Sequence, residues 1–214
     1  MKNILLLNPA IGTDNIGDYI IHECVCKEMA QILRQAFVRE IPTQMPAFHS
    51  YAIWKNSFAV QNFASCDYKF IGGSNILAKD MRTHYPQWNV NIFNCKPLSG
   101  SVCVGVGAGA GEHTDAYTTH LYRKILSHSY YHSVRDERSK RYVEDVLGLK
   151  AINTGCVTMW ALQLPLAWTL GNAFGATGIY AAMLCANAGS AFWYARLYAG
   201  KKWLEYGMRK RQNA

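Results

Sequence analysis

The sequence predicts an α/β fold with a parallel sheet, followed by a separate apolar segment. Through the first 150 residues, short apolar runs of strand length alternate with helical patterns and glycine-rich turns. Buried strands separated by helices favour a parallel sheet with helices on its faces. From Ala151 to Ala195 the chain then carries no Asp, Glu, Lys or Arg over 45 residues. Two unlike parts are therefore expected within one chain.

The first part is Rossmann-like in its order of elements. Asn3–Leu7 is a continuous apolar run that predicts the first strand, and apolar residues at helical spacing predict a helix over Asp18–Leu33. A second helix over Glu137–Leu147 ends at Gly148. The remaining strands are expected at Phe37–Ile41, Tyr68–Ile71, Ser101–Val106, Tyr130–Val134 and Ala151–Asn153.

The charge of the chain is concentrated in its tail. Residues 1–150 hold 16 basic and 13 acidic groups, whereas residues 196–214 hold six basic and one acidic. The net charge of +8 therefore comes mostly from the tail. It does not indicate the basic surface over the fold that a nucleic-acid-binding domain would show. A basic cluster directly after an apolar run is typical of the cytoplasmic flank of a membrane segment. A nucleic-acid-binding tail is the alternative interpretation.

The seven cysteines are scattered, and no secretory signal precedes them. This pattern favours free thiols in a reducing cytoplasm. Cys24 and Cys26 lie in a predicted helix, where positions i and i+2 face different sides, and the histidines show no metal-ligand spacing. No metal site is expected.

Five polar or glycine-rich loops follow the predicted strands, and parallel strands bring such loops to one edge of a sheet. Glycines let backbone N–H groups approach an anionic ligand, and Arg135 offers a planar guanidinium for carboxylate or phosphate. Each loop taken alone is also explained as a turn that needs positive φ. The residues expected at a ligand site are Asn15, Gly17, Asp18, Gly72, Gly73, Ser74, Asn75, Gly107, Ser133, Arg135 and Asp136.

Two alternatives apply to these loops. The glycines between Gly105 and Gly111 loosely fit a dinucleotide-binding fingerprint, but they follow the fourth strand, and no acidic residue is well placed about 20 positions on. Asp18 and Asp136 each stand near a helix start, where a carboxylate commonly caps backbone N–H groups. Asp18 is the better catalytic candidate because its loop follows the first strand. His113, just after the glycines, is a weaker candidate.

Taken together, these blocks resemble the polysaccharide pyruvyl transferase family. The residues that carry the resemblance are Asn15-Ile16-Gly17-Asp18, Phe70-Ile71-Gly72-Gly73-Ser74-Asn75, Gly105-Val106-Gly107, Ser133-Val134-Arg135-Asp136 with Ser139, and Asn153–Trp160. The resemblance covers about Lys2–Leu162. Val157 departs from it, since members often carry proline there.

The resemblance implies transfer of the enolpyruvyl moiety of phosphoenolpyruvate onto two sugar hydroxyls, giving a pyruvate ketal. It also implies one half of a two-domain GT-B-like fold. Among the residues present, Asp18 is the candidate base and Arg135 the candidate holder of the donor's anionic groups. The other expected site residues would contact substrate. Phosphoenolpyruvate and a glycan acceptor are the expected partners, with no cofactor and no nucleic acid.

Past Leu162 the chain departs from that family's second domain. Gln163–Gly171 and Gly175–Tyr180, with a basic end at Gly200-Lys201-Lys202-Trp203, resemble the last two helices of multidrug and toxic-compound extrusion transporters. We therefore expect two parts, a pyruvyl-transferase-like domain over residues 1–162 with its second domain missing, and a hydrophobic helical segment over residues 163–214.

The two apolar stretches, Val157–Phe174 and Ile179–Tyr198, are long enough to form a membrane hairpin. With both spanning, the domain and the basic tail would lie at the cytoplasmic face of the inner membrane. A hairpin buried in a soluble protein is the alternative.

Two functional hypotheses follow from the sequence. The first is a membrane-associated pyruvyl transferase that acts on a cell-surface or lipid-linked glycan. The second is a truncated or fused, inactive half-enzyme joined to a transporter remnant. On either hypothesis, a second chain would be needed to complete a two-domain active site.

Overall fold

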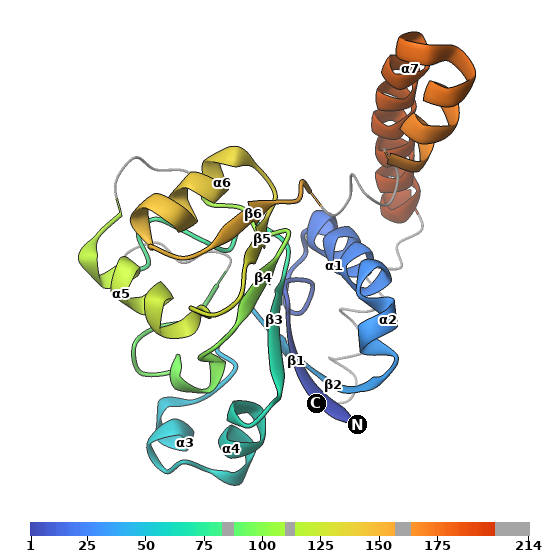
Figure 1. Cartoon of the computed structure of the whole chain (residues 1–214). Helices are drawn as coiled ribbons and strands as arrows, with labels where there is room; N and C mark the ends of the chain where they lie inside the picture. Colours follow the sequence, from blue (N-terminus) through green and yellow to red (C-terminus); the bar gives the residue numbers. More distant parts are fainter. Residues whose placement is uncertain (83–87, 110–113, 157–163, 200–214) are drawn as a thin grey trace.

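A computed structural model describes residues 1–82, 88–109, 114–156 and 164–199. Its centre is a parallel sheet in the order β2-β1-β3-β4, to which a parallel pair, β5 and β6, adds through the Val106–Val134 bridge (Figure 1). The α/β class and the parallel sheet predicted from the sequence are confirmed. The strands are β1 (Lys2–Asn8), β2 (Ala36–Pro42), β3 (Tyr68–Gly72), β4 (Val102–Val104), β5 (His132–Val134) and β6 (Ala151–Asn153).

Helices cover both faces of the sheet. The chain passes from β1 outward to β2 and then returns past β1 to β3, so right-handed crossovers place the first helices on one face and the later ones on the other (Figure 1). On the first face lie α1 (Ile16–Glu28) and α2 (Ala30–Leu33). On the second lie α3 (Ser50–Trp54), α4 (Phe58–Ala64), the 3-10 turn η1 (Lys96–Leu98), α5 (Ala116–Ile125) and α6 (Glu137–Arg141).

The core follows the alternation of the strands. Leu5 and Leu7 belong to the large cluster under α3 to α6, whereas Leu6 packs with Cys24 and Val25 of α1. Residues Ile4 to Leu7 are all fully buried, which is why β1 reads as a continuous apolar run rather than an alternating one.

Both long helices predicted from the sequence are interrupted. The expected helix over Asp18–Leu33 starts at Ile16 and divides at Met29 into α1 and α2. The expected helix over Glu137–Leu147 becomes α6 followed by a π-helical turn, η2 (Tyr142–Val146). Apolar spacing alone does not distinguish a continuous helix from one that changes its hydrogen-bond pattern.

The apolar segment forms α7 (Leu164–Ala199), which is broken at Gly175 with φ 61° and ψ −140°. Its two parts fold back on each other (Figure 1). They pack so closely that a side chain at Gly178 would overlap the carbonyl of Leu170 and one at Gly171 would crowd Ile179. α7 also contacts α1.

Membrane insertion of this segment finds no support. Within the described part of the chain, no helix combines the length and the hydropathy that a bilayer crossing requires. The expected boundary between residues 162 and 163 lies outside the described residues, as do Val157 and His113.

Candidate functional site

The carboxyl ends of the parallel strands carry the loops in which the sequence predicts ligand-binding residues. The chain reverses its direction across the sheet between β1, which continues to β2, and β3 on the other side. In open α/β sheets this switch point is where ligands bind, because the two adjoining loops leave in opposite directions. Asp18 follows β1 and Ser74 follows β3, so both lie at the switch point.

Asp18 joins the loops that follow three strands. Its Oδ1 accepts a hydrogen bond from Ser74 Oγ at 3.0 Å, and its Oδ2 accepts from Gln44 Nε2 at 2.9 Å. Asn15 Nδ2 and Thr13 Oγ1 also donate to Oδ2, at 3.3 and 3.4 Å. The side chain is nearly fully buried, and this burial raises its pKa, while the four donors act in the opposite direction. The carboxyl group therefore organises the edge of the sheet as well as being a candidate base.

The two glycines at the end of β3 allow close packing against α1. A side chain at Gly73 would overlap Ile21, and one at Gly72 would crowd Val25. Gly73 and Ser74 both have positive φ, at 67° and 63°, which turns the chain sharply as it leaves the sheet. A non-glycine residue in this conformation is uncommon and is held by its surroundings, here by the hydrogen bond from Ser74 to Asp18.

Arg135 lies against the backbone of Gly107. A methyl group at position 107 would come within 2.5 Å of Arg135 Nε and would overlap Asn75 Oδ1. This Asn75 oxygen is buried and has no hydrogen-bond partner among the described residues. The Arg135 side chain is 31% exposed and contacts the Asp136 carboxylate at 3.3 Å. A partly exposed guanidinium, a bare stretch of backbone and an unpaired acceptor thus meet at one place.

Two of the predicted site residues hold the loops together. Asp136 caps α6, its Oδ1 accepting from Ser139 N at 2.7 Å, and its pKa is lowered because the hydrogen bonds from Ser139 and the charge of Arg135 outweigh desolvation. Ser133 Oγ accepts from Gly105 N at 2.8 Å and hydrogen-bonds Thr154 Oγ1 at 2.6 Å. The capping alternative for Asp136 matches the geometry.

The expected residues form two groups. Asn15, Gly17 and Asp18 lie with Ser74, and Asn15 Oδ1 caps α1 by accepting from Gly17 N. Asn75, Gly107 and Arg135 form the second group, joined to the first because Gly107 N donates to Ser74 O at 2.8 Å. Gln44 was missed. It follows the second strand, so the rule that ligands collect at strand ends would have found it.

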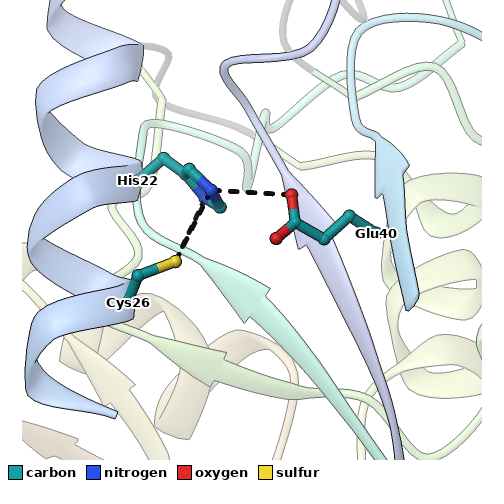
Figure 2. Close-up of side chains that lie close together, drawn as sticks. All are labelled: His22, Cys26 and Glu40. Carbon is teal, nitrogen blue, oxygen red and sulfur yellow. Dashed lines mark hydrogen bonds and ion pairs between the residues drawn. The ribbon is translucent and has the colours of Figure 1, made fainter. Parts of the chain in front are cut away.

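A further cluster was also missed, on the face of the sheet covered by α1. Figure 2 shows His22 and Cys26 on α1 pointing toward Glu40 on β2. The three potential ligand atoms lie within 4.8 Å of one another. The sequence contained a signal, because positions 22 and 26 are four residues apart and so share a helix face. The expectation of no metal site considered Cys24 with Cys26 and overlooked this pair.

Comparison with known proteins gives one match. The family model described as polysaccharide pyruvyl transferase matches residues 15–198. No curated protein matches the chain, and no solved structure does. The match runs from the Asn15–Asp18 loop through both residue groups and into α7, and nothing in these comparisons supports a transporter origin for α7. Since it covers well over half of the sequence, this chain belongs to the polysaccharide pyruvyl transferase family.

Proposed function

We propose that this protein transfers pyruvate from phosphoenolpyruvate to a sugar of a cell-surface or lipid-linked glycan, as a ketal. Family membership supports pyruvyl transfer in general. The donor and the acceptor class are part of the proposal.

The contact of Arg135 with Gly107 carries the proposal. Phosphoenolpyruvate presents a carboxylate and a phosphate, and a guanidinium binds either of them through paired N–H donors. Arg135 is partly exposed at the carboxyl edge of the sheet, and the absence of a side chain at Gly107 leaves its Nε next to bare backbone. We assign Arg135 to the donor's anionic groups.

The reaction then proceeds by two additions at one carbon. A sugar hydroxyl oxygen bonds to C2 of the enolpyruvyl group while the methylene carbon takes up a proton and becomes a methyl group. A second hydroxyl oxygen bonds to the same carbon as the C–O bond to phosphate breaks, which gives the ketal and inorganic phosphate. Each hydroxyl loses a proton, so the site needs a base and an acid. No cofactor is required, because the donor supplies both the carbon unit and the leaving group.

Asp18 is the base in this proposal. Burial raises its pKa, which brings a carboxyl group closer to the working pH at which general bases are most effective. Its Oδ1 is hydrogen-bonded to Ser74 Oγ, so Ser74 offers a path for a proton from the loop after β3.

The test is phosphate release from phosphoenolpyruvate by the purified chain in the presence of a glycan acceptor. We expect release that depends on the acceptor, and we expect Arg135→Ala to abolish phosphoenolpyruvate binding in isothermal titration calorimetry. Arg34→Ala is the matched control, because it removes the same charge from an exposed position just before β2, at the opposite edge of the sheet. Unchanged donor affinity in Arg135→Ala would remove this residue from the site. No release above background would contradict the proposed activity.

A further inference from the structure

In the cluster of His22, Cys26 and Glu40, the two distances that end at the imidazole nitrogen match a tetrahedral metal site, and all three ligand atoms lie within 4.8 Å of one another. A Zn²⁺ ion with bonds of about 2.0–2.3 Å places neighbouring ligand atoms about 3.4–3.6 Å apart. In the structure, His22 Nε2 lies 3.5 Å from Cys26 Sγ and 3.5 Å from Glu40 Oε2 (Figure 2). The distances from the imidazole nitrogen to the sulfur and to the carboxylate oxygen are therefore already those of a Zn²⁺ site.

The fold holds these ligands in place from two elements. His22 and Cys26 are one helical turn apart on α1, on the side that faces the sheet. On β2, Val38 packs against the buried cluster that includes Cys24 and Val25 of α1. Glu40 stands two residues later on the same strand, so its side chain points to the same face, toward α1. Neither arrangement depends on a flexible loop, which is what a site needs to select a metal by geometry.

Asn8 supports the same geometry from the end of β1. Its Nδ2 donates to Glu40 Oε2 at 2.7 Å and to His22 Nε2 at 3.1 Å, and its Oδ1 accepts from Ala10 N at 2.7 Å. The amide therefore holds the carboxylate and the imidazole toward each other. The hydrogen bond to Nε2 also requires this nitrogen to be unprotonated, which is the form that binds a metal. Metal binding would displace that one hydrogen bond and leave the one to Glu40.

The ligand set selects the kind of ion. Imidazole and thiolate favour Zn²⁺ over the hard ions Mg²⁺ and Ca²⁺, which prefer oxygen ligands alone. A thiolate and a carboxylate together carry two negative charges, which a divalent ion balances. The Glu40 side chain is 38% exposed and the His22 side chain 18%, so an ion can enter from solvent and keep a water molecule as its fourth ligand.

We propose that His22 Nε2, Cys26 Sγ and Glu40 Oε2 bind one Zn²⁺ ion that ties α1 to β2. The cysteine thiol loses its proton on binding, and the ion takes the place of that proton and of the Asn8 hydrogen bond to the imidazole. Asp18 lies one turn before His22 on the same helix, so the ion fixes the helix end that carries the candidate base. The site reaches beyond the proposed function, since pyruvyl transfer does not require it.

The experiment uses Co²⁺ as a spectroscopic substitute for Zn²⁺ in the purified, reduced chain. We expect binding of one equivalent of Co²⁺, with the near-ultraviolet charge-transfer band of a cobalt–thiolate bond, and loss of this band when one equivalent of Zn²⁺ is added. Zn²⁺ should also raise the melting temperature, because a ligand that binds only the folded state stabilises it.

Three variants locate the site. Cys26→Ser should lose the charge-transfer band, and Glu40→Gln should keep the band but bind Co²⁺ at least about tenfold more weakly. Cys185→Ser removes an exposed thiol on α7 and should bind as the parent does. Glu40 is at the surface, so Glu40→Gln folds even if a substitution at Cys26 disturbs the packing of α1.

Two outcomes would overturn the proposal: no cobalt–thiolate band in the parent, or a band that survives in Cys26→Ser. These measurements need neither phosphoenolpyruvate nor an acceptor. A failure here therefore leaves the proposed function intact, and an inactive protein leaves this site testable.

Discussion

Replacing Gly107 by alanine should displace Arg135 and so weaken binding of the donor. The added methyl carbon would lie 2.5 Å from Arg135 Nε and 2.9 Å from its Cζ, whereas ordinary contacts between heavy atoms are about 3.5–4.0 Å. The guanidinium must therefore retreat by about 1 Å. A misplacement of this size in a positioning group can cost about 100-fold in rate. Gly107 is not among the glycines with positive φ, so the effect comes from the overlap and not from backbone strain.

We expect Gly107→Ala to lower kcat/KM by about 100-fold and to raise the Kd for phosphoenolpyruvate at least about tenfold, measured by phosphate release and calorimetry. Gly109→Ala is the matched control in the same loop. Its methyl carbon would meet no atom closer than 3.4 Å, and its φ is not positive, so donor binding should be unchanged. A folded Gly107→Ala protein that binds the donor with parental affinity would refute the assignment of Arg135.

Two further predictions concern buried titratable groups. Asp18→Asn should lower kcat at least about 100-fold, because an amide cannot act as the base. It should change the free energy of unfolding by less than about 1 kcal/mol, because the amide oxygen can accept from the three donors on Oδ2 and the amide N–H can donate to Ser74 Oγ. Asp18→Ala should cost about 2–4 kcal/mol in urea unfolding, since it leaves those donors without their acceptor; parental turnover in Asp18→Asn would reduce Asp18 to a positioning residue. His132 is fully buried, and its Nδ1 accepts from Cys103 N. Burial lowers the pKa of this imidazole, so below the ordinary pKa of about 6.5 the unfolded chain binds more protons than the folded one. The free energy of unfolding should therefore fall as the pH decreases from about 6.5. His132→Gln should flatten this dependence, and an equal slope in both proteins would contradict it.

The sequence predicted the centre of the sheet well because the central strand β1 is buried on both faces. A run such as Asn3–Leu7 has no polar alternation, and it is bounded by turn residues, so both its type and its parallel pairing follow. The breaks at Met29 and after Arg141 could not be predicted, because apolar spacing does not record which backbone hydrogen bonds form. The expected membrane setting of the apolar hairpin finds no support, because within the described residues no helix has the length and hydropathy of a bilayer span. The absence of charged residues shows only that the segment is apolar. It does not show that the helix breaks at Gly175, which depends on how the segment folds.

For the candidate site, the sequence by itself determined which loops meet, because parallel strands bring their carboxyl ends to one edge. It also identified the family, and the match over residues 15–198 confirms it. Only the tertiary structure decided the pairings across that edge: Asp18 with Ser74 and Gln44, and Arg135 with Gly107. The same holds for Glu40 opposite His22 and Cys26. Contacts between distant segments depend on strand register and helix rotation, which no local pattern of residues specifies.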